Sequence, residues 1–386
     1  MRTSSSSSDM QAGVTQTGVV EKLVSGGDGL VREDGLVVFI PGALPGETIR
    51  YRPGSIRKGF SRGVLIEVLS PSADRRKPPC PLYGRCGGCD FMHLSDQAQP
   101  RAKALLVQEA FRRLGKKEIG LPEVVSGPAW AYRARLQLHK DHPGAPVGFK
   151  ARGSDKTVPV TACPVAAPGF SSLLASGGPE LRVGRTNAFS VGDDAFVEGK
   201  DSQVTLEVSG KRLTSSLDGF FQSNLALLPS LISTVLDALP ATGHRVLDLY
   251  GGSGLFGAFL ADRYETVVEV EQNPAALALA RLNVVGPLHE FHESTLEAWV
   301  SRLPKYGPPL DAIVVDPPRT GLSPEVTAYL GTGPAPVLVY VSCNPDTLAR
   351  DARGLQDSGW IMTSLKLFDF YPQTTHIEAV ARFVRA

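Results

Sequence analysis

The stretch that decides the fold is Val246-Leu247-Asp248-Leu249-Tyr250-Gly251-Gly252-Ser253-Gly254, an apolar run that ends in a glycine-rich turn. Its continuous apolar residues predict a strand that is buried on both faces, as in parallel sheets covered by helices. Glycines after such a strand let the backbone approach a ligand closely. The spacing differs from the G-x-G-x-x-G pattern of dinucleotide-binding proteins. We therefore expect an α/β domain with a ligand site at this turn.

The same rhythm of strands and helices continues to the C-terminus. The expected strands are Arg245–Tyr250, Thr266–Val270, Asp311–Val315, Pro336–Val341, Met362–Phe368 and Ile377–Phe383. The expected helices are Gly254–Asp262, Pro274–Val284, Ser323–Leu330 and Asp346–Ser358. This alternation predicts a mostly parallel, doubly wound, Rossmann-like sheet over residues 217–386. Ligands of such sheets bind beyond the carboxyl ends of the strands.

Acidic residues follow two of these strands. Glu271 lies twenty residues after Gly251, at the end of the second strand, where a carboxylate can accept both ribose hydroxyls. A glycine turn alone is often an ordinary tight turn, but together with this acid it favours S-adenosylmethionine. A later strand ends in Asp316-Pro317-Pro318-Arg319, whose prolines cannot continue the ladder. Amino-group methyltransferases carry an aromatic residue where this motif has Arg319, which disfavours methylation of an exocyclic amine.

Cys343 follows the expected strand Pro336–Val341 and has two interpretations. It can be a buried cysteine that packs as a small hydrophobe, or it can be a nucleophile. Methylation at carbon 5 of a pyrimidine needs a thiolate that adds to carbon 6 and a base that later removes the carbon-5 proton. Glu378 opens the last strand, which can lie beside Pro336–Val341, and is the candidate base, although a glutamate so near the terminus is often a surface residue. His376 is the alternative base or a support.

The other four cysteines are Cys80, Cys86, Cys89 and Cys163. Their crowding and the odd total of five argue against a disulfide framework and for a reducing cytoplasm. Four soft ligands suit zinc or an iron–sulfur cluster. Structural zinc sites usually show two close pairs, so this spacing favours a cluster while leaving zinc open.

The N-terminal half is β-rich. Residues 13–70 contain short strands separated by glycine and proline, which predicts a small OB-like barrel. Residues 71–216 form a mixed, β-rich central domain, in which Ala98–Leu114 is an expected helix. Its expected buried face consists of Ala102, Leu105, Leu106, Ala110 and Leu114. Residues 1–12, a serine-rich run, are expected to be a disordered tail.

Charge is unevenly distributed along the chain. Residues 50–156 carry 21 Lys and Arg against 9 Asp and Glu, and the remaining residues carry 19 against 30. A basic half joined to an acidic half predicts polyanion binding, although a solvated basic surface would have the same composition. The stretches 132–135 and 57–60 mix cationic and aromatic residues and are candidate RNA contacts or solvated strand edges. Because no apolar run is long enough for a bilayer, we expect no membrane partner.

Four ordered motifs resemble those of the RNA (uracil-5-)-methyltransferase family. They are Phe220-Phe221-Gln222-Ser223-Asn224, Asp316-Pro317-Pro318-Arg319, Ser342-Cys343-Asn344-Pro345 and His376-Ile377-Glu378. The resemblance covers nearly the whole chain, including a TRAM-type barrel at residues 13–70. It implies that Cys343 is the nucleophile and Glu378 the proton-abstracting base. It further implies that S-adenosylmethionine contacts Gln222, Tyr250, Glu271, Ser294 and Asp316, although the family often has Asn at the Ser294 position.

The resemblance also bears on the four clustered cysteines and on the substrate. Iron–sulfur members of the family carry this cysteine arrangement and hold a [4Fe–4S] cluster. They imply methylation of a specific uridine in 23S rRNA, with a tRNA uridine as the alternative because archaeal tRNA enzymes share the cysteines. We expect a cytoplasmic monomer. Two rival hypotheses are a non-catalytic iron–sulfur RNA-binding protein and a cytosine C5-methyltransferase.

Overall fold

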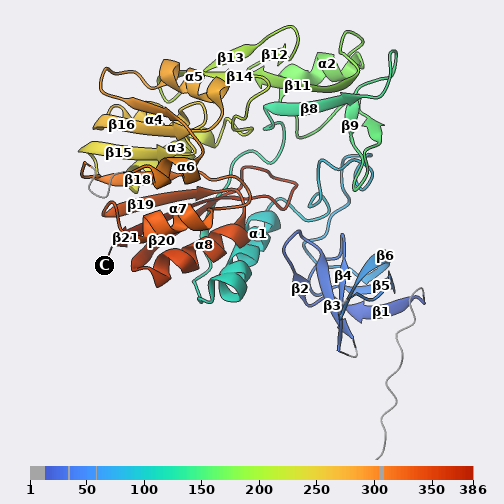
Figure 1. Cartoon of the computed structure of the whole chain (residues 1–386). Coiled ribbons are helices and arrows are strands. Elements are labelled where there is room, and N and C mark those ends of the chain that lie inside the picture. The colour runs from blue at the N-terminus through green and yellow to red at the C-terminus, as the bar shows by residue number, and fades with distance from the viewer. Residues whose placement is uncertain (1–13, 34, 58, 304–307, 386) are drawn as a thin grey trace, which may run out of the picture.

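The computed structural model describes residues 14–33, 35–57, 59–303 and 308–385. The expected tail at residues 1–12 and the candidate RNA contact Lys58 lie outside the described residues. Figure 1 shows a small N-terminal β-rich unit, a central β-rich part and a larger α/β part that contains the C-terminus.

The N-terminal unit is a six-stranded sheet that closes on itself. Its strands are β1 (Gln16–Val19), β2 (Lys22–Leu23), β3 (Gly29–Glu33), β4 (Leu36–Ile40), β5 (Thr48–Pro53) and β6 (Phe60–Ser70). The strand order is β1-β5-β6-β4-β3-β2. β1 and β2 are the two edge strands in this order, and they follow each other directly in the sequence. The short connection between them therefore links the two edges of the sheet. Alternate residues such as Ile49 and Tyr51 point inward and form the core of this barrel.

The central part consists of an antiparallel sheet and a hairpin. The strands and short helices are β8 (Arg135–Lys140), β9 (Gly148–Lys150), β10 (Thr157–Pro159), α2 (Ser171–Ala175), β11 (Gly184–Val191), β12 (Asp194–Val197), β13 (Gln203–Val208) and β14 (Lys211–Ser216). The sheet has the order β10-β9-β8-β11-β12, and β13 pairs only with β14. Leu136, Leu138 and Phe170 lie in its core.

The α/β part is built on an eight-stranded sheet with the order β17-β16-β15-β18-β19-β21-β20-β7. The strands are β7 (Glu123–Val125), β15 (Gly243–Leu249), β16 (Tyr264–Glu271), β17 (Glu290–Glu293), β18 (Ala312–Val315), β19 (Val337–Ser342), β20 (Trp360–Phe368) and β21 (Glu378–Arg385). Strands β15 to β19 are parallel, whereas β21 is antiparallel to both of its neighbours. The prediction of a mostly parallel sheet is confirmed.

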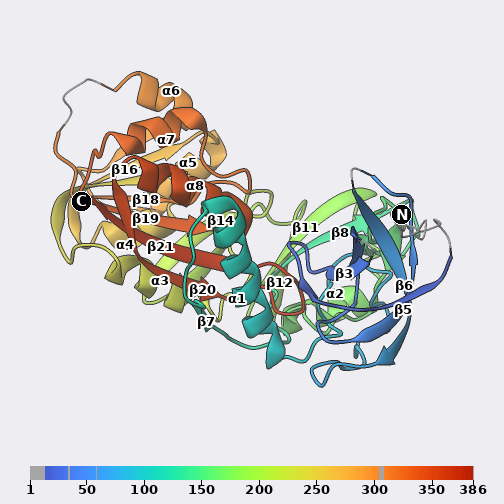
Figure 2. The ribbon, with the colours of Figure 1, turned by 90° about the horizontal axis from the view of Figure 1, so that it is seen from below.

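Helices cover both faces of this sheet (Figure 2). They are α1 (Ala98–Ala110), α3 (Leu228–Asp237), α4 (Leu255–Leu260), α5 (Pro274–Asn283), α6 (Leu296–Ser301), α7 (Pro324–Gly331) and α8 (Pro345–Asp357). Apolar residues of α3 and α4 pack with one face, and those of α1, α6, α7 and α8 pack with the other. The central strands β18 and β19 are therefore buried along their whole length, which explains their continuous apolar runs. Within the described ranges, no helix is long and apolar enough to cross a membrane.

The expected helix at Ala98–Leu114 is α1 followed by a π-helical turn at Phe111–Gly115. The expected buried face was wrong at Leu105, which is 45% exposed. Gln99 and Lys103 instead lie buried, because their polar groups are hydrogen-bonded to a loop of the α/β part. Residues of α1 and β7 thus precede the central sheet in the sequence but pack with the C-terminal sheet.

Candidate active site

The glycine-rich turn after β15 is shaped by left-handed backbone conformations. Tyr250, Gly252 and Gly254 have φ values of 62°, 58° and 77°. The Tyr250 N–H donates to the carbonyl oxygen of Val270 at 3.0 Å, and the Gly252 N–H donates to Glu271 Oε2 at 3.1 Å. These bonds tie the ends of β15 and β16 together, so the Tyr250 ring and the Glu271 carboxylate lie at the same edge of the sheet.

A cavity of about 630 Å³ opens at this edge. Of the site residues that the sequence predicts, it is lined by Gln222, Tyr250, Glu271, Asp316, Cys343 and Glu378. Ser294 lines a neighbouring hollow of about 310 Å³, to which Tyr250 and Glu271 also contribute. The structure therefore brings residues from six separate segments to one site, with Ser294 next to it.

Two polar groups of the cavity have capacity to bind a ligand. Gln222 is buried, and its Oε1 has no hydrogen-bond partner among the residues that the structure describes. A buried amide oxygen without a partner is costly, so a donor on a bound molecule would stabilise it. Glu271 Oε1 accepts one hydrogen bond, from the Asn273 N–H at 2.7 Å, and a carboxylate oxygen can accept further hydrogen bonds from ligand hydroxyls.

Cys343 lies in the turn between β19 and α8. The neighbouring Asn344 caps α8 by accepting the Asp346 N–H at 3.1 Å, and its Nδ2 donates to the Arg319 carbonyl at 2.9 Å. This contact joins the Cys343 turn to the turn after β18. The thiol lines the large cavity on one side and a hollow of about 220 Å³ on the other, with Arg319 and His376 in its wall. Cys343 is thus accessible from two sides.

Glu378 reaches the same cavity from the antiparallel strand β21. Ser342 at the end of β19 pairs with Ala379, so the expectation that the last strand lies beside the strand before Cys343 is confirmed. Glu378 is 2% exposed, and it is therefore no surface residue. The neighbouring strands place one buried carboxyl group and one thiol on the same cavity wall.

Burial shifts the pKa values of the ionisable groups around Cys343. Burial raises the pKa of Cys343 to about 11, assisted by Glu378 and Asp316 and opposed by the Arg319 guanidinium. Burial raises the pKa of Asp316 to about 7. The pKa of Glu378 is raised well above its usual range by burial and by the charge of Asp316. Burial and Arg319 lower the pKa of His376 to about 4, so this imidazole is neutral at neutral pH.

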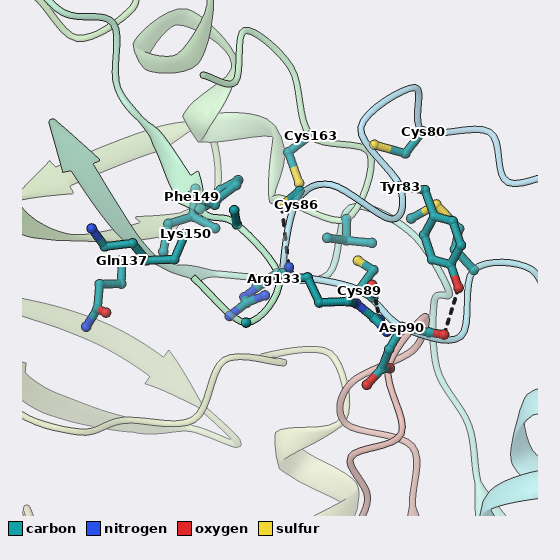
Figure 3. Close-up of a pocket in the computed structure, with 18 of the residues that line it drawn as sticks. Cys80, Tyr83, Cys86, Cys89, Asp90, Arg133, Gln137, Phe149, Lys150 and Cys163 are labelled. Atoms are coloured by element: carbon teal, nitrogen blue, oxygen red, sulfur yellow. Dashed lines mark hydrogen bonds between the residues drawn. The ribbon is translucent and has the colours of Figure 1, made fainter. Parts of the chain in front are cut away.

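The four clustered cysteines line a separate cavity of about 540 Å³ between the barrel, the central sheet and the segment that joins them. Figure 3 shows the side chains of Cys80, Cys89 and Cys163 pointing into this space. Burial raises the pKa of Cys86, of Cys163 and, to about 12, of Cys89. Across the described part of the chain, no three His, Cys, Asp or Glu side chains are close enough to hold one metal ion.

The geometric requirement of a multi-iron group differs from that of a single metal ion. In a four-iron cluster each thiolate binds a different iron, so its ligands lie farther apart than the ligands of a single ion. The Gly88 N–H donates to Cys86 Sγ at 3.4 Å, and hydrogen bonds of this kind to ligand sulfurs tune such clusters. Four thiols therefore line one cavity, and they are the residues that could hold such a group.

The structure changes the expectation for the candidate RNA contacts. Tyr132 is buried, and its hydroxyl donates to the Pro372 carbonyl at 2.9 Å, so it is neither an exposed RNA contact nor part of a solvated strand edge. Arg135 donates to the Leu217 carbonyl at 3.3 Å, and Arg133 lines the cysteine cavity. Phe60 is 40% exposed, and the contact predicted for its segment stays a prediction.

Comparison with known proteins agrees with this geometry. The 23S rRNA (uracil(1939)-C(5))-methyltransferase RlmD of Azoarcus sp. strain BH72 is 34% identical, over 96% of this chain and 99% of the relative. The chain belongs to the RNA (uracil-5-)-methyltransferase family. An RNA methyltransferase of Treponema denticola is 32% identical over 91% of this chain and 94% of its own length. The profile of the tRNA (Uracil-5-)-methyltransferase family matches residues 302–385.

A solved structure shows the same fold over nearly the whole methyltransferase. It is the tRNA (uracil-54, C5)-methyltransferase of Pyrococcus abyssi in complex with S-adenosyl-L-homocysteine. The TM-score is 0.74 at 24% identity, and the match covers 96% of this chain and 100% of that one. The barrel, central sheet and α/β part of this chain therefore form a known arrangement for the family.

Proposed function

We propose that this methyltransferase transfers a methyl group from S-adenosylmethionine to carbon 5 of a uridine in 23S rRNA. The observation that carries the proposal is one cavity lined by a thiol, Cys343, and a buried carboxyl group, Glu378, together with the Gln222, Tyr250 and Glu271 side chains. Methylation at carbon 5 of a pyrimidine requires a nucleophile and a base near the same ring. Full-length relatives with this activity support the assignment.

The chemistry runs through a covalent intermediate. The Cys343 thiolate adds to carbon 6 of the uracil, and the enolate that forms attacks the methyl group, releasing S-adenosylhomocysteine. Glu378 then removes the proton from carbon 5, the double bond re-forms and the thiolate leaves. Burial raises the pKa of Cys343, the positive charge of the Arg319 guanidinium partly offsets that rise, and only the thiolate is nucleophilic.

Glu378 is better suited than His376 to be the base. A base is most effective when its pKa lies near the working pH. Burial raises the pKa of Glu378, whereas His376 has a pKa of about 4 and lies with Nε2 3.5 Å from the Arg319 guanidinium. We assign His376 a supporting role, as an acceptor for Arg319.

Methyl-donor binding would use residues at the ends of four strands, Tyr250, Glu271, Ser294 and Asp316, together with Gln222. Glu271 would accept the ribose hydroxyls, with Ser294 beside it, and Gln222 and Asp316 would contact the methionine portion and the target ring.

The barrel at residues 16–70 would be the TRAM-type RNA-binding module. Phe220 is 70% exposed at the cavity wall and could stack on an RNA base; such stacking contributes about 1–3 kcal/mol per base.

The choice of 23S rRNA over tRNA rests on the relatives. Enzymes of Azoarcus and Cronobacter sakazakii with 34% and 33% identity are named for uracil 1939 of 23S rRNA. The tRNA enzyme of Pyrococcus abyssi has only 24% identity. A ribosomal substrate would place the enzyme in the cytoplasm.

We assign a [4Fe–4S] cluster to Cys80, Cys86, Cys89 and Cys163, where it would cross-link the 80–89 loop to the central sheet.

The covalent step provides the decisive experiment. Glu378→Gln enzyme incubated with 23S rRNA fragments and S-adenosylmethionine should accumulate a protein–RNA adduct that survives denaturation. Glu325→Gln, the same change at an exposed position of α7, serves as the control and should turn over normally. The wild-type product should be 5-methyluridine by nucleoside mass spectrometry. 5-Methylcytidine would establish the cytosine alternative, and a wild type without adduct or product would establish a non-catalytic RNA-binding protein.

The cluster assignment has its own test. Anaerobically purified protein should contain about four irons per chain and absorb in the visible range, since each cysteine binds one iron. Cys163→Ser should lower the iron content and the absorbance, while Cys343→Ser should leave both unchanged and abolish methylation. Stoichiometric zinc without iron in the anaerobic protein would replace the cluster by a zinc site.

A further inference from the structure

The loop between β20 and β21 leads into Glu378, the proposed general base. The buried side chain of Lys103 is hydrogen-bonded to this loop. The loop runs over residues 369–377 and leads directly into Glu378. Lys103 of α1 has no exposed side-chain area, and it lies 266 residues before its ion-pair partner Asp369. Its Nζ donates to Asp369 Oδ1 at 2.5 Å, to the Tyr371 carbonyl at 3.0 Å and to the His376 carbonyl at 2.9 Å.

These three bonds use every donor of the lysine. An ammonium group has three N–H bonds, and here each goes to a different residue of the same loop. Two partners lie near the start of the loop, and the third, His376, lies near its end. The lysine therefore fixes the distance between the two ends of the loop. Because His376 is two residues before Glu378, a change in the distance between the ends of the loop would displace the Glu378 carboxyl group.

The rest of the loop is also held from outside the C-terminal sheet. One turn before Lys103 on α1, Gln99 accepts the Gln373 N–H at 2.7 Å and donates to Gln373 Oε1 at 3.0 Å. Asp90 accepts the Thr375 N–H at 2.8 Å. Gln373 has a φ of 69°, a conformation that non-glycine residues rarely adopt without such support. The loop geometry thus depends on side chains outside the sheet that it connects.

We propose that Lys103 is a positioning residue for the proton-abstraction step, setting where Glu378 stands relative to Cys343 and the substrate ring. This inference rests on the proposed function of Glu378. Burying an ammonium is unfavourable unless it is paired and fully hydrogen-bonded, and an apolar side chain on the buried face of α1 would satisfy packing alone. The lysine contributes what an apolar residue cannot, which is three directed bonds to one loop.

The proposal predicts a selective defect. The variant Lys103→Met with Asp369→Asn removes both charges, so that neither is left buried and unpaired. Under single-turnover conditions with RNA tritiated at carbon 5, methyl transfer should be nearly unchanged. Tritium release should slow by about 100-fold, the effect expected when a catalytic group is misplaced by about 1 Å. A denaturation-resistant methylated adduct should accumulate.

Controls separate positioning from stability. Calorimetric binding of S-adenosylhomocysteine counts the folded sites, to which all rates are normalised. Lys22→Met is the matched control, because the Lys22 ammonium forms an ion pair at 2.8 Å with Glu109 of α1, the helix that carries Lys103, at a partly exposed site. This substitution should leave methyl transfer and tritium release unchanged. If the double variant does not fold, Asp369→Asn alone tests the contact and should show the same selective defect in weaker form.

The outcomes separate the positioning role of Lys103 from the assignment of Glu378 as the base. Glu378→Gln is assayed in parallel. If Glu378→Gln accumulates the adduct but the Lys103 variant slows both steps equally, or neither step, the positioning role is refuted and the proposed function stands. If Glu378→Gln itself accumulates no adduct while wild type turns over, the assignment of Glu378 as the base is refuted.

Discussion

The reactivity of Cys343 should depend steeply on pH in the RNA-free enzyme. Burial, together with Glu378, raises the pKa of this thiol to about 11. At pH 8, three units below that value, only about one thiol in a thousand is the reactive thiolate. Alkylation by iodoacetamide should therefore accelerate about tenfold for each pH unit between 7 and 10, without a plateau.

Two substitutions should shift this profile in opposite directions. Arg319→Gln removes the positive charge that lowers the pKa of Cys343, so alkylation at a given pH should be slower. Glu378→Gln removes the carboxylate that raises the same pKa, so alkylation should be faster. Because the pKa of Glu378 is itself raised, the second difference should widen as the pH rises and this carboxyl group ionises.

Mass spectrometry of the peptide that contains Cys343 separates its alkylation from that of the other four cysteines. Glu325→Gln, at an exposed position, should reproduce the wild-type profile. A rate that reaches a plateau below pH 8 would show a thiolate already formed at neutral pH. It would refute the argument that burial keeps the Cys343 thiol protonated at neutral pH.

Three further predictions concern the stability of the α/β part. Asp351→Ala leaves the Tyr340 hydroxyl and a backbone N–H buried without their acceptor, and it should lower the free energy of unfolding by roughly 2–4 kcal/mol in urea titrations. Gly257→Ala places a methyl group against Glu269 Oε1 and should cost about 1–3 kcal/mol; adding Glu269→Ala should recover that loss, and additive losses would contradict the clash. Burial raises the pKa of Asp248 from 3.8 to about 7, so the folded protein keeps a proton that the unfolded chain releases, and stability should fall as the pH rises from about 4 to 7. Asp316→Asn removes the neighbouring carboxyl charge that, after burial, contributes most to raising the pKa of Asp248, and it should flatten this fall in thermal melts, whereas an unchanged slope would show that the two groups are not coupled.

The C-terminal fold could be predicted from the sequence because its signals are local. Apolar runs such as Thr266–Val270 identify strands that are buried on both faces, and the helices between them carry their own start signals, such as Asn273 before Pro274. Parallel strands end at a common edge, so residues that follow different strands could be expected at one site. The cavity brings Glu271, Asp316 and Cys343 together for this reason.

Predictions failed or were missing where a contact spans the chain. Hydrophobic periodicity assumes that polar residues face solvent, so it placed Leu105 in the buried face of α1 and left out Lys103. The partners that make the burial of Lys103 favourable lie at residues 369–376, where no local pattern reveals them. Tyr132 was misjudged in the same way, because its hydroxyl is satisfied by a carbonyl 240 residues later.

The sequence by itself thus determined the order of strands and helices, the residues at the strand ends and the presence of one thiol separate from the cysteine cluster. Only the tertiary structure decided that α1 and β7 pack with the C-terminal sheet and that Glu378 is buried beside the turn of Cys343. The physical reason is range: periodicity and turn chemistry act over a few residues. The burial of a charged group depends instead on partners that only the folded chain brings within hydrogen-bond distance.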